Sequence, residues 1–319
     1  MTTRRPAPTA RPAAPTAHAA APTARPVLLV VAHGSRDPRH AATVHALVRR
    51  AAVMRPGLRV ETAFLDFNVP SVPAVLDRLA TEGVRDVVAL PLLLTRAFHA
   101  KADIPAVLRQ APPTLNIRQA EVLGPSPLLL SALERRLYEA GPAPGMKPST
   151  GVVLASAGST DPAAAVLTRG TPPGPPAGSP AGPVPGTPQW RHAVARMKRS
   201  TGVVLASAGS TDPEANAAIA ETARELRRAG WCAVRPAFAS ASLPRTEDAV
   251  RALRAEGVRR VAVAPYVIAP GRLPDRIAAG AAEADVLAGV LGPAPELARL
   301  LLERYDGARA AGRVLAAAV

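Results

Sequence analysis

The chain has 319 residues, of which 39 are Lys or Arg and 24 are Asp or Glu, so its formal net charge is +15. This length allows two domains that each bury a core. Much of the positive excess falls in residues 1–26 and 141–201, outside the candidate domains. With three Tyr, four Phe and two Trp, the chain offers no aromatic platform on which bases could stack. We therefore expect no nucleic-acid partner.

Cys232 is the single cysteine, which excludes an intrachain disulfide and a thiolate metal cluster. No apolar run approaches the roughly 20 residues that cross a bilayer. Residues 1–26 contain no hydrophobic segment typical of a secretory signal. These features predict a cytoplasmic protein without a membrane partner.

Half of the 36 prolines fall in residues 1–26 and 141–201. Such stretches bury too little apolar surface to offset the entropy of ordering. We interpret 1–26 as a disordered basic tail rich in Pro and Ala, 141–201 as a disordered Pro/Gly-rich linker, and 309–319 as a short C-terminal tail.

From Val27 onward, short apolar runs alternate with longer segments of helical periodicity, a pattern typical of strand–helix units on a parallel sheet. Asp37 followed by Pro38 is a typical helix start, since the Asp side chain can accept the free backbone N–H groups. The segment 27–140 is the predicted N-terminal domain. Its strands are predicted at 27–32, 59–65, 86–94 and 117–122, and its helices at 38–54, 71–82, 100–110 and 126–140.

The same order returns over 202–308, the predicted C-terminal domain. AFLDFNVPSV (63–72) corresponds to AFASASLPRT (237–246), and LGPSP (123–127) to LGPAP (291–295). The strands are predicted at 202–208, 232–239, 259–268 and 285–291, and the helices at 213–229, 245–256, 273–282 and 294–305. This internal duplication predicts an α/β fold of two tandem similar domains, each a parallel sheet of about four strands flanked by helices, facing each other across a cleft. One chain then builds both walls, so a monomer suffices.

A third copy of the first strand lies in the linker. MKPSTGVVLASAGSTDP (146–162) and MKRSTGVVLASAGSTDP (197–213) differ at a single position. Only the second is followed by an amphipathic helix, so the surrounding sequence must decide between them. We predict that 202–208 is the strand and that 151–162 is a stray duplicate in a disordered insertion.

Three side chains able to bind a metal follow predicted strands of the first half: His33, Asp66 and His99. In an open parallel sheet, ligands bind beyond the carboxyl ends of the strands. Two imidazoles and a carboxylate suit a cation such as Fe(II), Co(II) or Ni(II). At the matching places the second half has Ala208, Ser240 and Leu273, none of them a good ligand.

Each of these residues also has a purely structural interpretation. A histidine at a strand end is often an ordinary hydrogen-bonded side chain, and Asp66 can cap the following turn. His40 and His45 belong to the first helix, five positions apart and off a common face, so both are interpreted as incidental.

Three stretches resemble one protein family: VAHGSRDP (31–38), AFLDFNVPSV (63–72) and PLLLTRAFHAKADIP (91–105). They are similar to the sirohydrochlorin chelatases, the ATP-independent class that inserts cobalt or ferrous iron into a tetrapyrrole for cobalamin or sirohaem. The resemblance is strong over 27–140 and looser over 202–305, as in a two-lobed member with a degenerate second half.

The resemblance implies that His33 and His99 hold the metal and accept pyrrole protons. Asp66 matches an acidic position that is Glu in many members, so it would bind the metal directly or through water. The divalent metal, Co²⁺ or Fe²⁺, enters as a substrate, and no nucleotide is implied, since the chain has no G-x-x-x-x-G-K-[ST] loop. The other partner is an anionic tetrapyrrole. Its carboxylates would meet a group of polar residues next to the motif histidines, each of which can instead be a solvated surface residue: Ser35, Arg36, Arg96 and Lys101.

Two other functions fit part of the pattern. AHGSR (32–36) is similar to the Arg-His-Gly motif of histidine phosphatases, but Ala32 stands where that chemistry needs an arginine. A non-catalytic carrier of metal or tetrapyrrole would use the same ligands as a chelatase, and the sequence does not separate the two.

Overall fold

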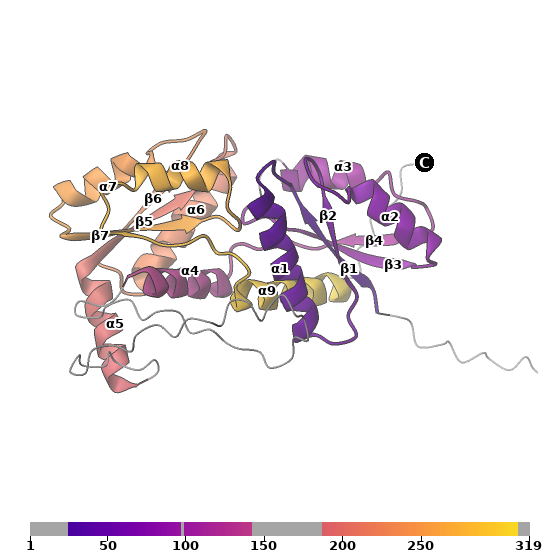
Figure 1. Cartoon of the computed structure of the whole chain (residues 1–319), viewed down its shortest axis with the longest axis horizontal. Helices are drawn as coiled ribbons and strands as arrows, with labels where there is room; N and C mark the ends of the chain where they lie inside the picture. Colours follow the sequence, from indigo (N-terminus) through magenta and orange to yellow (C-terminus); the bar gives the residue numbers. More distant parts are fainter. Residues whose placement is uncertain (1–24, 97–98, 142–186, 312–319) are drawn as a thin grey trace, which may run out of the picture.

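The computed structural model describes residues 25–96, 99–141 and 187–311, with the side chains of His99 and Ala100 outside the description. Two four-stranded parallel sheets, each flanked by helices, lie beside one another (Figure 1). This confirms the predicted α/β class and its repeated architecture. The predictions for 1–24, 142–186 and 312–319 fall outside the described residues.

The N-terminal sheet has the strand order β2-β1-β3-β4, with all neighbours parallel. Its strands are β1 (Val27–Ala32), β2 (Val60–Phe64), β3 (Asp86–Pro91) and β4 (Asn116–Gln119). In the register, Val30 pairs with Thr62 on one side and Leu90 on the other. Every residue of β1 is buried, because a central parallel strand is covered on both faces.

Successive residues of β1 pack against different helix layers, because side chains alternate across a strand. Leu29 lies in one buried cluster with residues of α2 (Val72–Thr81) and α3 (Ile104–Leu108). Val30 lies in the other with residues of α1 (Pro38–Met54) and α9 (Pro295–Ala310). Asp37 caps α1 as predicted, accepting from the Arg39 amide at 2.9 Å.

The C-terminal sheet repeats this arrangement as β6-β5-β7-β8. Its strands are β5 (Thr201–Ser207), β6 (Ala233–Phe238), β7 (Arg260–Tyr266) and β8 (Val286–Leu287). The helices between them are α6 (Pro213–Arg228), α7 (Thr246–Ala255) and α8 (Arg272–Gly280). Strand β5 confirms that 202–208 carries the sheet strand, while the near-identical segment at 146–162 lies outside the described residues.

Several element boundaries differ from the prediction. The helix predicted at 100–110 is divided into a π-helical turn, η1 (His99–Asp103), and α3. Pro105 lacks the N–H that would continue the α-helical bonding, which favours the wider turn before it. Strand β8 has two residues instead of the predicted seven, and α9 continues past 305 to Ala310.

The last helix of each half packs on the sheet of the other half, which the sequence did not predict. Helix α4 (Pro127–Ala140) follows β4 but packs against β7, β8 and α6, whereas α9 follows β8 but packs against β3, β4 and α1 (Figure 1). We therefore define the N-terminal lobe as β1–β4 with α1, α2, η1, α3 and α9. The C-terminal lobe comprises β5–β8 with α4, α6, α7 and α8.

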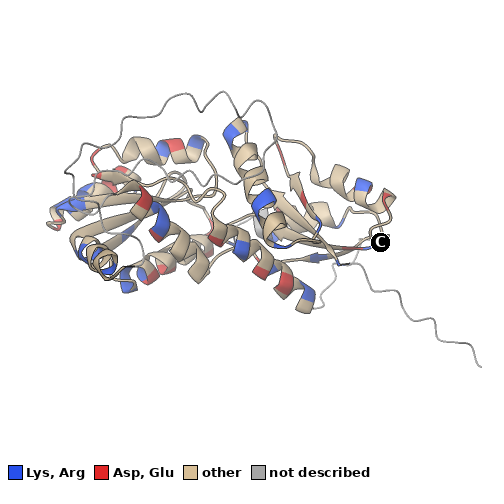
Figure 2. Cartoon of the chain, turned by 60° about the horizontal axis from the view of Figure 1, so that its bottom comes forward, with Lys and Arg blue, Asp and Glu red and all other residues tan. Residues whose placement is uncertain are grey.

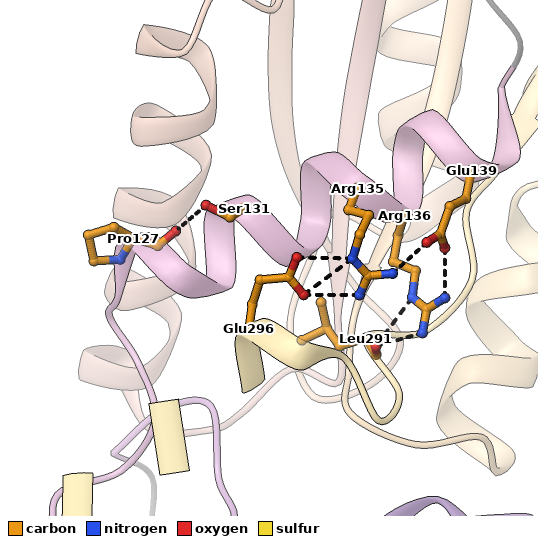
Figure 3. A network of polar contacts seen from close by, with 7 residues as sticks. All are labelled: Pro127, Ser131, Arg135, Arg136, Glu139, Leu291 and Glu296. Atoms are coloured by element: carbon orange, nitrogen blue, oxygen red, sulfur yellow. Dashed lines mark hydrogen bonds and ion pairs between the residues drawn. The ribbon is translucent and has the colours of Figure 1, made fainter. Parts of the chain in front are cut away.

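Two arginines at equivalent positions of the repeat hold the exchanged helices in place by hydrogen bonds. Arg136 on α4 donates from Nε and Nη2 to the carbonyl oxygen of Leu291, at 3.2 and 2.9 Å (Figure 3). Arg304 on α9 donates to the carbonyl oxygens of Val122 and Leu123, both at 2.8 Å. Leu123 and Leu291 are equivalent positions of the repeat. Each exchanged helix thus reaches back to the turn after the last strand of the opposite sequence half.

A second contact joins the two exchanged helices directly. Arg135 on α4 binds both carboxylate oxygens of Glu296 in the first turn of α9, with Nε–Oε1 at 3.0 Å (Figure 3). Glu139 accepts from Arg135 and Arg136 at the far end of α4. The repeat supplies no counterpart, since Leu128 and Glu303 occupy the equivalents of Glu296 and Arg135.

The segment 141–201, predicted to lack regular structure, contains a helix at its end, α5 (Pro188–Ser200). Its residue Trp190 packs edge-on against Tyr138, which also stacks on Trp231. Lys198 forms an ion pair with Glu134 at 2.5 Å. These aromatic and ionic contacts are long-range, so local propensity in a Pro-rich segment could not reveal them.

Charged residues of both signs are mixed on the helices of both lobes (Figure 2). Among the described residues, no helix has the length and apolar composition needed to span a membrane.

We expect Arg304→Ala and Arg136→Ala each to lower the free energy of unfolding by about 2 kcal/mol, because each removes hydrogen bonds from a charged donor to carbonyls that then lack their partner. Arg299→Ala, at an exposed position of α9, is the control and should change stability by less than about 0.5 kcal/mol. Urea denaturation followed by circular dichroism measures all three. Equal midpoints would contradict the role assigned to the two arginines.

Candidate active site

A cleft of about 650 Å³ lies between the two lobes. It is formed by the carboxyl ends of β1 and β3 on one wall and of β5 and β7 on the other, where parallel sheets place their ligand sites. Most of its lining comes from four segments: 32–35, 92–95, 207–211 and 266–274.

His33 follows β1 directly and lines this cleft. Its Nδ1 lies 3.3 Å from the carbonyl oxygen of Gly34. A neutral ring that donates from Nδ1 keeps its basic lone pair on Nε2, the arrangement found in many metal-binding histidines. The His33 carbonyl oxygen accepts from the Asp66 amide at 2.9 Å, which fixes the turn after β1 to the turn after β2.

Gly34 permits this close approach of the two turns. Its φ is +97°, and a Cβ at this position would lie 1.9 Å from the carbonyl oxygen of Asp66. The Ser35 amide then donates to Oδ1 of Asn68 at 2.8 Å, and Ser35 Oγ accepts from the Asp37 amide at 3.1 Å. Ser35 therefore lines the cleft while its hydroxyl also supports the start of α1.

The C-terminal lobe repeats this turn without the imidazole. The Ala208 carbonyl oxygen accepts from the Ser240 amide at 2.9 Å. Gly209 has φ +86°, and a Cβ there would lie 2.0 Å from the Ser240 carbonyl oxygen. The Ser240 hydroxyl also donates to Ala208 at 2.9 Å. The two walls of the cleft therefore share a backbone but differ in chemistry, with imidazole on one side and methyl on the other.

Asp66 is exposed, and its Oδ1 accepts from the Phe67 amide at 2.8 Å. Phe67 itself has φ 60° and an exposed fraction of 47%. The Phe67 ring centroid lies 6.2 Å from the ring centroid of His33 and 4.8 Å from the guanidinium carbon of Arg36. The structure thus brings His33, Arg36 and Asp66 to one pair of neighbouring turns, together with Phe67, which the sequence analysis missed.

His99 begins η1 on the same lobe, after β3. Its side chain is outside the described part of the structure, so its predicted approach to His33 stays a prediction. Among the side chains that are described, no group of three His, Cys, Asp or Glu is placed to hold a metal ion.

Two basic residues cross from one lobe to the other as ion pairs. Lys101 of η1 binds Asp212 at 2.9 Å and Glu214 at 2.6 Å. The hydrogen bonds that Lys101 donates to these two carboxylates, Asp212 first, raise the pKa of Lys101. Arg39 of α1 binds Asp275 of α8 at 3.1 Å. All three of these ion pairs lie at least partly in solvent, so they contribute more to orientation than to stability.

Arg96, also predicted to meet substrate carboxylates, is exposed and forms an ion pair with Glu121 at 3.3 Å. This pair stays within the N-terminal lobe. Tyr266 of β7 lines the cleft from the other lobe, and burial raises the pKa of its phenol, which therefore remains neutral.

The two histidines of α1 have different surroundings. His45 packs edge-on against the Phe64 ring at 5.7 Å, a structural role consistent with its interpretation as incidental. His40, however, lines the cleft, which differs from that interpretation. The i, i+4 spacing places His40 and Val44 on one face of α1, but only the structure shows that this face lines the cleft.

The CbiX family model matches residues 27–140 and 202–308, most of the chain. The chain belongs to the CbiX family. The resemblance seen in the three sequence motifs is thereby confirmed, and both halves of the sequence carry the family's pattern.

Individual relatives agree with this assignment. The sirohydrochlorin cobaltochelatase of Priestia megaterium is 25% identical over 295 residues, covering 88% of this chain and 78% of that protein. Among solved structures, SirB from Bacillus subtilis with Fe³⁺ is similar with a TM-score of 0.63 at 19% identity, covering 89% of this chain and 95% of that one. SirB from Bacillus subtilis subspecies spizizenii in complex with cobalt has a TM-score of 0.62 at 18% identity, covering 90% and 97%. At these identities the structural likeness supports the fold alone.

Gly34→Ala should lower the free energy of unfolding by about 3 kcal/mol or more, because the new Cβ meets the Asp66 carbonyl oxygen in addition to the left-handed backbone cost. Gly57→Ala is the matched control, since Gly57 also has a positive φ, +79°, but nothing lies within 4 Å of its added Cβ. It should cost only about 1 kcal/mol. Thermal and urea denaturation compare the pair, and similar losses would show that the contact between the two turns is unimportant.

Proposed function

We propose that this protein is a sirohydrochlorin chelatase that inserts Co(II) or Fe(II) into the tetrapyrrole without ATP. The observation that carries the proposal is the chemical asymmetry of the interlobe cleft, with His33 on one wall and Ala208 at the equivalent place on the other. The name of the Priestia megaterium relative, sirohydrochlorin cobaltochelatase, and the metals in the two SirB structures support the same chemistry.

Metal insertion exchanges two pyrrole N–H protons for one M(II), so the site must present a loosely held metal and accept protons near neutral pH. Imidazole can do both. In this proposal His33 and His99 bind the metal and accept the protons, and Asp66 supports the metal directly or through water. The metal is a substrate, and either cobalt or ferrous iron satisfies the same ligands.

The tetrapyrrole is a polycarboxylate, and the basic residues around the N-terminal turns can meet it. Arg36 lies over the ring of Phe67 beside His33. From this position the guanidinium can meet a carboxylate of the tetrapyrrole, and the Phe67 ring can contact its flat face. Lys101 would exchange its contacts with Asp212 and Glu214 for a substrate carboxylate. Arg96 and Ser35 complete the predicted substrate-binding set.

The test is an anaerobic assay that mixes the full chain with sirohydrochlorin and Co(II) or Fe(II) and follows the visible spectrum. We expect a rate above the spontaneous one, reduced at least about tenfold in His33→Ala and in His99→Ala, because a general base typically contributes about 100-fold or more. His192→Ala, on α5 and exposed, is the control and should keep the full rate. Stoichiometric binding without acceleration would contradict the proposal and indicate a carrier.

Lys101→Met should raise KM for sirohydrochlorin while leaving kcat within about twofold, because the lost charge acts in substrate binding and not in proton transfer. Added salt should raise KM of the wild type in the same direction. Lys198→Met, which removes a lysine paired with Glu134 on the C-terminal lobe, is the matched control. An unchanged KM in Lys101→Met would remove Lys101 from the substrate-binding set.

A further inference from the structure

His40 lies in the first turn of α1 and lines the same wall of the cleft as His33. Val44, one turn further along α1, lines the same cleft, because residues i and i+4 share a helix face. The helix therefore presents an imidazole to the space between the lobes.

Nδ1 of His40 is buried and has no hydrogen-bond partner. Such atoms are uncommon in native proteins, and each calls for a ligand, an ion or a water to explain it. Five buried side-chain atoms of the described residues share this state: His40 Nδ1, Arg118 Nε, Thr201 Oγ1, Ser207 Oγ and Arg245 Nη1. Two of them, on His40 and Ser207, belong to residues that line the cleft, one from each lobe.

Burial lowers the pKa of His40, and the neighbouring His33 lowers it further, against a smaller opposing effect of Asp37. Neutral imidazole is the form that donates a lone pair to a metal.

Both histidines are replaced by alanine in the second half of the internal duplication. Ala208 and Ala215 are the equivalents of His33 and His40, and both line the opposite wall. The start of the helix is otherwise the same, since Asp37 and Asp212 cap α1 and α6 in the same way. The two imidazoles are therefore present together on one wall and absent together from the other.

We propose that His40 is a further metal-binding residue of the cleft, which gives a ring nitrogen to the divalent metal beside His33. The identity of the metal rests on the proposed function, whereas the binding role rests on the unpartnered nitrogen and its place in the cleft. Ser207, on the facing wall, offers a hydroxyl to a water molecule bound to the same ion.

The experiment is an anaerobic calorimetric titration of the full chain with Co(II) alone, with the visible absorption of the bound cobalt recorded in parallel. His40→Gln and His40→Ala should weaken Co(II) binding by about tenfold or more, the lower end of the loss seen when a metal site loses a supporting group. Both should change the cobalt spectrum. Ser207→Ala should produce a smaller loss, and His192→Ala none.

His40→Gln nearly preserves side-chain size, so it keeps the test informative if His40→Ala unfolds, and circular dichroism checks both variants. Wild-type affinity together with a wild-type cobalt spectrum in His40→Gln would overturn the inference. Insertion of cobalt into sirohydrochlorin is measured on the same samples. If the wild type fails to insert metal while His40→Gln still binds Co(II) more weakly than the wild type, the proposed function is refuted and the role of His40 stands.

Discussion

Arg136 and Arg304 each hydrogen-bond the carbonyl oxygens of the turn that follows the last strand of the opposite sequence half. These contacts close an exchange in which α4 covers the C-terminal sheet and α9 covers the N-terminal sheet. One buried cluster consequently runs through the inner layers of both lobes, from β1 and α1 to β5 and α6. Because a helix of the other half completes the cover of each sheet, the two walls of the cleft are held in a fixed relation.

On this common frame, the two walls have diverged in the groups that matter for chemistry. The turns after β1 and β5 keep the same glycine conformation and the same hydrogen bond to the neighbouring turn. Phe67 and Ala241 even share a positive φ at equivalent positions. The side chains differ, since one wall has imidazoles at His33 and His40 and the other has methyl groups at the equivalent Ala208 and Ala215. A duplicated backbone thus provides a two-walled cleft, and one wall carries the nitrogen ligands.

The ion pairs across the cleft follow the same repeat with the charges exchanged. Arg39 of α1 and Glu214 of α6 are equivalent positions of the repeat, and so are Lys101 of η1 and Asp275 of α8. Arg39 binds Asp275, and Lys101 binds Glu214. Two pseudo-symmetric pairs therefore join the lobes, each with one basic and one acidic end. Exposed pairs of this kind contribute little stability, and a polyanionic ligand can compete for their cations.

Periodicity and the repeated motifs determined much of this protein from the sequence alone. They predicted the parallel strands, the duplication, the position of His33 at a strand end and the choice of 202–208 over its near-identical copy, because these follow from local patterns and from what comes next along the chain. The exchange of α4 and α9, the helix α5, the exposed Phe67 beside His33 and the cleft-facing His40 were decided by tertiary structure. Each depends on contacts between residues far apart in sequence. The apolar pattern of an amphipathic helix is the same whichever of two similar sheets the helix covers, so the pattern could not predict the exchange.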